Sequence, residues 1–260
     1  MALSLNRPLL AELKVDYGPR TLLGRFFLKA ADAAARQGVT LSVGTFADLV
    51  EVNHRNRATW LPLDTAYRPD LSDVGDPTTI CILGRDGRGD VVATQGLRLF
   101  DWTSTNLKVE AEALRLFYSD PSRHAAPGES CTVSAPSAIT ITGRVAYGGA
   151  IWYRPDYRGG RLSTILPRIG RAMAFTKWNV ATVFALVIES NAKAGFPARI
   201  GYTNLEWDFI RNNPPAFKSD ANVLRLGLAT MTAIQSIDDV FGYLLEVEPE
   251  VYAGVQMRNA

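Results

Sequence analysis

Residues 150–191 read as a strand, a tight basic loop, a helix and a second strand, and this unit strongly constrains the fold of the 260-residue chain. Pro155 cannot donate a hydrogen bond to a neighbouring strand, so the strand that begins near Val145 should end at or before Arg154. An apolar run over 183–188 predicts the second strand. The helix between them is predicted from apolar residues at 3.6-residue spacing, which are Leu162, Ile165, Leu166, Ile169, Met173 and Ala174.

The loop that opens this helix has the features of an anion site. Gly159 and Gly160 allow the main chain to approach a ligand closely. The free N–H groups at the start of a helix favour negative charge, and Arg158 and Arg161 add formal positive charge. The residues therefore predict a phosphate or pyrophosphate ligand, with an ordinary turn carrying two surface arginines as the alternative. The G-x-G-x-x-G and G-K-[ST] spacings are both absent, which argues against a dinucleotide fingerprint and a Walker A loop.

The run from Tyr153 to Ser163 resembles the acetyl-CoA loop of the GCN5-related N-acetyltransferases, whose signature is V-x-P-x-x-[RQ]-G-x-G-x-[GA]. Tyr153 takes the apolar start, Pro155 the proline, and Arg158 with Gly159 the Arg/Gln-Gly pair. The chain departs from the signature twice, with Arg161 in place of a glycine and Ser163 in place of glycine or alanine.

The residues after the helix extend the resemblance to about residue 202. Asn191 follows the second strand, as an asparagine does in the family, and the pair Gly201-Tyr202 stands in for Gly-Phe. The tyrosine that many members place in the intervening helix as general acid is missing, because Pro197 and Ala198 occupy that region.

The resemblance implies an α/β fold in which a mixed, mostly antiparallel sheet is flanked by helices, with residues 38–260 as one acyltransferase domain. Residues 1–37 are then an N-terminal extension with a helix, and residues around 106–129 are an insert. It also implies acetyl-CoA or another acyl-CoA as co-substrate. The residues carried over are Trp152, Tyr153 and Arg154 for the pantetheine arm, Arg158, Gly159, Gly160, Arg161, Leu162 and Ser163 for the pyrophosphate, and Asn191.

Two residues are the candidates for acid and base chemistry. No carboxylate occurs between Glu129 and Asp156, so the strand before the loop offers no base. Glu189, at the end of the second strand, is the best carboxylate by position, and a surface charge is the alternative. Tyr147 is expected either to reach the same cleft or to fill the core.

Other polar and aromatic residues have weaker functional interpretations. Trp60 and Tyr67 are either walls of an acceptor pocket or core aromatics, and Tyr202 is expected in the core. His54 lies near the expected acceptor entrance, with a solvated residue at a helix end as the alternative. Cys81 lies in an apolar run that predicts a buried thiol.

The leading function is N-acyl transfer from acyl-CoA, most simply acetyl-CoA, to a small-molecule or peptide amine. Two alternatives stay open: acyl transfer of the kind that acyl-homoserine-lactone synthases perform, and a non-catalytic ligand-binding or protein-interaction module. A serine hydrolase is disfavoured because the G-x-S-x-G elbow is absent.

Composition narrows the class of protein. A net charge of +2 argues against a broad role on nucleic acid or a membrane surface. No run of 18 apolar residues predicts a membrane span, and the first residues lack a signal-peptide pattern, so a cytoplasmic location is expected. Two cysteines make no disulfide framework, and two histidines give no metal-ligand spacing. A homodimer paired through a closing strand is compatible with this fold.

Periodicity and turn residues predict the remaining elements. Helices are expected over 20–37, 45–54, 106–118 and 223–235, and strands over 39–43, 78–84, 90–100, parts of 131–153 and 243–247. Residues 85–89 suit the turn of a hairpin, and Gly148 with Gly149 is expected to mark a β-bulge beside the ligand.

Overall fold

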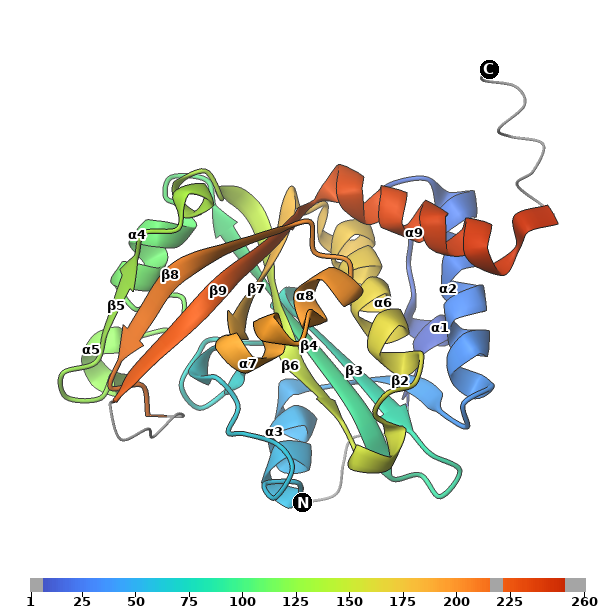
Figure 1. The fold of residues 1–260 in the computed structure, drawn as a ribbon, viewed down its shortest axis with the longest axis horizontal. Coiled ribbons are helices and arrows are strands. Elements are labelled where there is room, and N and C mark those ends of the chain that lie inside the picture. The colour runs from blue at the N-terminus through green and yellow to red at the C-terminus, as the bar shows by residue number, and fades with distance from the viewer. Residues whose placement is uncertain (1–6, 216–221, 251–260) are drawn as a thin grey trace.

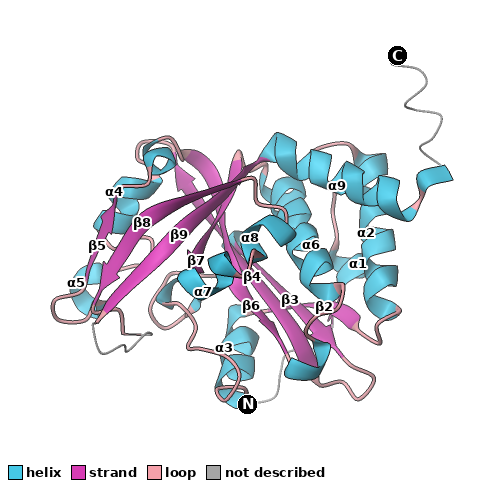
Figure 2. Ribbon diagram, viewed as in Figure 1, coloured by secondary structure: helices cyan, strands magenta, loops and turns pink. Residues whose placement is uncertain are grey.

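The computed structural model describes residues 7–215 and 222–250, and within them one sheet contains nine strands in the order β1-β2-β3-β4-β6-β7-β9-β8-β5 (Figure 1). All neighbouring strands are antiparallel except β6 and β7, which are parallel. The expected α/β fold with a mixed, mostly antiparallel sheet is thereby confirmed, and Figure 2 shows helices around this sheet. The strands are β1 (Arg7–Pro8), β2 (Thr40–Gly44), β3 (Thr79–Arg85), β4 (Val91–Trp102), β5 (Ser130–Val133), β6 (Gly143–Tyr153), β7 (Thr182–Ile188), β8 (Asn204–Asn212) and β9 (Val223–Thr232).

Helices cover both faces of the sheet. The helices are α1 (Leu9–Glu12), α2 (Arg20–Ala35), α3 (Phe46–Arg55), α4 (Leu107–Glu112), α5 (Pro121–His124), α6 (Leu162–Trp178), α7 (Glu189–Lys193), α8 (Phe196–Arg199) and α9 (Ala233–Val247). Helices α2, α6 and α9 pack together on one face, whereas α3 and α4 lie with residues 60–74 on the other. Strand β3 shows the alternation that separates the two cores, since Ile80 and Ile82 enter the first and Cys81 and Leu83 the second.

Local sequence signals explain the first half of the fold. Helix α3 begins after Thr45, whose hydroxyl accepts from the Asp48 amide while the Asp48 carboxylate accepts from the Thr45 amide. The turn between β3 and β4 closes on Asp86, whose carboxylate accepts from the amides of Arg88 and Asp90. The predictions of helices over 20–37 and 45–54 and of the hairpin are confirmed to within a few residues.

The sequence prediction was wrong near the C-terminus. The helix expected over 223–235 is strand β9, and the strand expected over 243–247 is the end of helix α9. Strand β9 is covered on both faces, since Leu226 and Leu228 enter one core and Ala229 and Met231 another, so it lacks the alternation of a half-buried strand. Helix α9 begins only at Ala233, after Thr232, whose hydroxyl and Gln235 form a capping box.

The segment between β4 and β6 also differs from expectation. The helix predicted over 106–118 is only α4, because Leu114 adopts a left-handed conformation with φ of 61°. Residues 121–124 form the short helix α5. Strand β5 pairs with β8 at the far edge of the sheet, separated from β6 by a 3-10 turn over Pro136–Ile139.

Candidate functional site

The site lies where strands β6 and β7 separate. They pair only from Val145 to Tyr147 and from Thr182 to Phe184, and then diverge. A cavity of about 520 Å³ lies beyond this point, lined by residues 148–153 of β6 and 185–188 of β7. Its lining includes Val187 and Ile200 from the small core under α7 and α8, and Leu226 from the core on the opposite face. The cavity therefore passes through the sheet between the two strands.

A bulge in β6 shapes one wall of this cavity, as the two glycines predicted. Gly149 pairs with Gly96 and Trp152 with Thr94, so two residues of β6 stand opposite one residue of β4. Ala150, inside the bulge, has a φ of 50°, and its carbonyl oxygen accepts from the Thr94 hydroxyl at 2.9 Å. The bulge turns this stretch of β6 away from regular pairing and toward the cavity.

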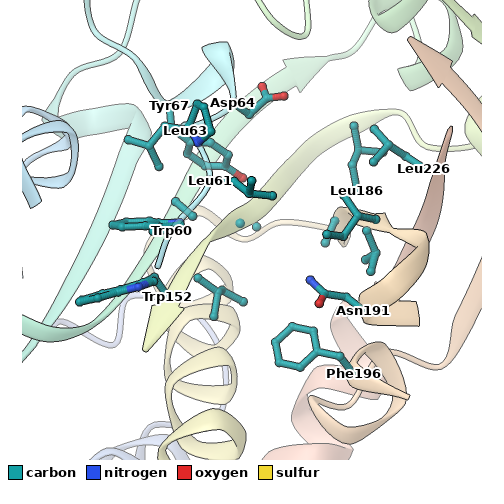
Figure 3. A pocket seen from close by; sticks show the side chains of 18 of the residues that line it. Trp60, Leu61, Leu63, Asp64, Tyr67, Trp152, Leu186, Asn191, Phe196 and Leu226 are labelled. Carbon is teal, nitrogen blue, oxygen red and sulfur yellow. The ribbon is translucent and has the colours of Figure 1, made fainter. Parts of the chain in front are cut away.

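Aromatic residues form the wall next to the end of β6. The Trp60 and Trp152 rings stack with centroids 5.4 Å apart, and the Trp152 indole N–H donates to the Thr59 hydroxyl. Tyr67 lies against Gly149, where an added Cβ would stand 2.5 Å from the tyrosine hydroxyl. Trp60 and Tyr67 both line the cavity, and Figure 3 shows them on the same wall with Leu61 and Leu63. Both residues therefore line the cavity and also pack in or against the hydrophobic core, so the two interpretations apply together.

The loop between β6 and α6 keeps several amides free. Gly159 has a φ of 78°, and Arg161 is the residue before the helix. Among the described residues, no backbone carbonyl accepts from the amides of residues 159–163. The Ser163 hydroxyl donates to the Gly160 carbonyl, and the Arg161 side chain is exposed. A helix of 17 residues thus points its N-terminus at a loop with unpaired donors, which is an arrangement suited to an anion.

Two of the arginines expected near the ligand are held by protein atoms. The Arg158 Nε donates to the Tyr153 carbonyl and its Nη2 to the Thr59 carbonyl, each at 3.0 Å. Arg154 pairs with Asp86 and Asp156. Arg158 lines the cavity, together with Trp152, Tyr153 and Asn191, whereas Arg154 and residues 159–163 are not among the described lining residues.

The structure separates the two catalytic candidates. Glu189 is exposed and pairs with Lys193 of the same helix at 2.9 Å, and this hydrogen bond lowers the pKa of the carboxyl. It is not among the described residues that line the cavity. Tyr147 lines the cavity and stacks on Phe184 with centroids 5.0 Å apart. Burial raises the pKa of Tyr147 well above its usual value, so its hydroxyl keeps its proton at neutral pH.

Asp64 is a cavity residue that the sequence reasoning missed. It is the one carboxylate among the described lining residues, and it lies at the end of the cavity away from Trp152 (Figure 3). Its Oδ1 accepts from the Ala66 amide at 2.9 Å, and its Oδ2 pairs with Arg211 at 2.6 Å. Arg211 lies 147 residues away in the sequence, and no short-range pattern links the two residues.

Arg211 is a fully buried hub behind this carboxylate. Its second terminal nitrogen pairs with buried Glu129 at 2.7 Å, and its guanidinium lies 3.7 Å from the centre of the Phe117 ring. The Glu129 carboxylate also accepts from the Tyr118 hydroxyl. These contacts hold Asp64 in one orientation at the wall of the cavity.

The other candidates are not among the described lining residues, although the Tyr202 hydroxyl lies close to Gly148, which lines the cavity. His54 is exposed at the end of α3, and Tyr202 is buried in the core under α8. Cys81 and Cys131 are buried free thiols, and burial raises the pKa of Cys131 to about 12. The described residues contain no group of three metal-ligating side chains. No helix in the described part of the chain is both long enough and apolar enough to cross a membrane.

Comparison with known proteins finds similarity only among solved structures. No family model matches the sequence, and no curated protein matches it. The chain is similar to a protein described as a phosphinothricin N-acetyltransferase, at 14% identity and a TM-score of 0.42, over 75% of this chain and 98% of that one. It is also similar to mutant forms of the spermidine/spermine N-acetyltransferase SpeG from Vibrio cholerae, at 11% identity and a TM-score of 0.44, over 78% and 98% of the two chains.

Proposed function

We propose that this protein is an acyl-CoA-dependent N-acyltransferase that uses acetyl-CoA or another acyl-CoA and a small-molecule or peptide amine. The observation that carries the proposal is the separation of β6 from β7 over a through-sheet cavity, beside the free amides that precede α6. An acyl-CoA needs both parts, because its pantetheine arm is long and amide-containing and its pyrophosphate is anionic.

The open strand edges suit the arm of the donor. Within the described part of the chain, β6 has no strand partner on its β7 side after Tyr147, and β7 has none on its β6 side after Phe184. Free backbone groups on such edges bind an extended amide chain as an added strand would. Trp152, Tyr153 and Asn191 border the space in which this arm would lie.

The loop suits the pyrophosphate. The unpaired amides of residues 159–163 and the N-terminus of α6 supply donors and partial positive charge. Arg161 is exposed at the start of the helix, so its guanidinium is available to a phosphate in the place where the family signature has glycine. Arg158 contributes by holding the loop against Tyr153 and Thr59.

The transfer itself requires a balanced movement of protons. The amine nitrogen attacks the thioester carbonyl carbon, the C–S bond breaks, the amine loses a proton and the departing thiolate gains one. Tyr147 is the candidate acid, because it lines the cavity and its hydroxyl is a proton donor. Glu189 faces Lys193 instead of the cavity, so we do not assign it the role of base.

A non-catalytic binding module is the second candidate. This candidate is favoured because Arg154 and Arg158 bind other groups of the same chain. Fewer cations are then left to bind a phosphate than the family signature implies. Such a module would bind CoA without releasing product.

Thermal shift and turnover measurements test the proposal together. Acetyl-CoA, a longer acyl-CoA and CoA should each raise the Tm, since ligand at a hundredfold over its Kd adds about 2.7 kcal/mol of stability. Arg161→Ala and Gly160→Pro should reduce this shift, whereas Arg88→Ala, an exposed arginine in the β3–β4 turn, should not. Release of free CoA in the presence of amines would establish the enzyme. Stabilisation without release across a broad amine panel would favour the binding module, and no shift with any CoA species would contradict both.

A further inference from the structure

We propose that the acceptor is an amine with a single positive charge on an apolar body, and that Asp64 binds its ammonium group. This inference rests on the proposed acyl transfer only in naming the amine an acceptor, because the binding site itself follows from the cavity. The chemical class of this amine follows from the cavity wall, in which one carboxylate lies among mostly apolar side chains.

Charged side chains are scarce in the cavity. Among the described lining residues only Asp64 and Arg158 carry charge, and Arg158 is held by the Tyr153 carbonyl next to Trp152. Asp64 lies at the other end of the cavity from Trp152 (Figure 3). A ligand that reaches this end therefore meets a carboxylate with no lining cation beside it.

Each oxygen of the Asp64 carboxylate accepts one hydrogen bond from the described residues, from the Ala66 amide and from Arg211, and a carboxylate oxygen can accept two. One guanidinium, that of Arg211, is shared between Asp64 and Glu129, and of these two carboxylates only Asp64 lines the cavity. Arg98, which is also near, donates to the Ala66 carbonyl and not to Asp64. A ligand ammonium that reaches a second lone pair of this carboxylate would gain a charge-assisted hydrogen bond.

The other residues that line the cavity determine what kind of molecule can carry the ammonium group. Leucine side chains line much of the cavity, namely Leu61, Leu63, Leu186, Leu224 and Leu226. An apolar body buries its surface there favourably, whereas further ammonium groups of a polyamine would be desolvated without partners. A single-charge hydrophobic amine therefore fits better than a polyamine.

The position of Asp64 also suits an acceptor. It follows Leu63 on the face of the sheet that carries α3, whereas the donor loop precedes α6 on the opposite face. Because the cavity passes between β6 and β7, an amine entering from the Asp64 side would meet a thioester held along the open edge of β6. Leu61 lines the cavity and is 54% exposed, so the cavity reaches solvent at this residue.

Calorimetric titration of the full chain without CoA tests the assignment. The probes are 2-phenylethylamine, its neutral analogue 2-phenylethanol, and spermidine. We expect the wild type to bind the amine at least tenfold more tightly than the alcohol or the polyamine. Equal binding of amine and alcohol, or tighter binding of spermidine, would overturn the assignment and needs no variant.

Two substitutions separate the ligand contact from the support behind it. Asp64→Asn keeps the acceptor for the Ala66 amide and should weaken amine binding at least tenfold while leaving the alcohol unchanged. Tyr118→Phe removes the hydrogen bond to Glu129 behind the same Arg211, leaves every charge in place, and should change amine binding less than twofold. Equal losses in both variants would show a structural effect and overturn the assignment. Amine binding without CoA release would leave Asp64 assigned while contradicting acyl transfer.

Discussion

The Arg158 guanidinium joins two segments that lie 99 residues apart, because its Nη2 donates to the Thr59 carbonyl oxygen at 3.0 Å. The Nε of the same group donates to the Tyr153 carbonyl at the end of β6. Thr59 precedes Trp60, which stacks on Trp152. The expected donor loop and the aromatic wall of the cavity are thus connected through one side chain.

Arg158→Met should loosen this wall. Without the two hydrogen bonds, residues 59–61 lose their connection to β6 except through the Trp60–Trp152 stack and the Trp152 indole N–H. We expect amide hydrogen exchange in this segment to rise about tenfold, which corresponds to about 1.4 kcal/mol. Arg154→Met is the control, because Arg154 pairs with Asp86 and Asp156 instead. Similar exchange in both variants would contradict the connection.

Arg211→Met should destabilise the protein strongly. The substitution leaves Asp64 and Glu129 without their shared cation, and breaking a buried pair in this way costs about 3–5 kcal/mol. Urea unfolding followed by circular dichroism measures the change. Arg225→Met removes an exposed pair with Asp208 and should cost at most about 1 kcal/mol. A loss for Arg211→Met no larger than for Arg225→Met would refute the role of Arg211 as a hub.

Gly149→Ala should overpack the cavity wall. The added Cβ would stand 2.5 Å from the Tyr67 hydroxyl oxygen, and relieving such contacts typically costs about 1–3 kcal/mol. Combining it with Tyr67→Phe removes the clashing oxygen, so the double variant should lose less than the sum of the single losses. Gly24→Ala in α2, where a Cβ meets nothing within 4 Å, should instead stabilise by about 0.5–1 kcal/mol. Additive losses in the double variant would argue against the contact.

Glu110→Gln should change how stability depends on acid. The hydrogen bond from Arg115 lowers the pKa of the Glu110 carboxyl in the folded state. The stability that this carboxylate contributes to the folded protein is therefore present above its unfolded pKa of about 4.3. That contribution is lost as pH falls through the folded pKa. Below pH of about 4.3 the wild type should therefore lose stability faster than Glu110→Gln, as measured by urea midpoints at each pH. Parallel curves would exclude this linkage.

Tyr147→Phe should slow the chemical step. A general acid contributes about 10²–10⁴-fold to rate, so kcat should fall about a hundredfold while KM for the acyl-CoA changes little. The stack on Phe184 survives the substitution, which keeps the wall intact. Tyr202→Phe is the matched control, because Tyr202 is buried and is not among the described lining residues. A larger fall in kcat for Tyr202→Phe would assign the acid to that residue instead.

The sequence correctly predicted those elements that a single strong local feature specifies, such as a proline, a helix cap or regular apolar spacing. Pro155 and the spacing from Leu162 to Ala174 placed the end of β6 and the course of α6, and Thr45 placed the start of α3. The same reasoning failed for β9, because a strand buried on both faces resembles a short buried helix segment in its apolar content. It also missed Asp64, since an aspartate that caps a short turn looks like any polar loop residue.

The sequence by itself determined the strand–loop–helix–strand unit, the glycines of the bulge and the anion-suited loop, because these depend on residues within a few positions of one another. Only the tertiary structure decided that β6 and β7 separate after three pairs and that Arg158 binds Thr59. It also decided that Asp64 faces the cavity with Arg211 behind it. Those relationships join residues far apart in the chain, and the packing that brings them together follows from the whole fold rather than from any local pattern.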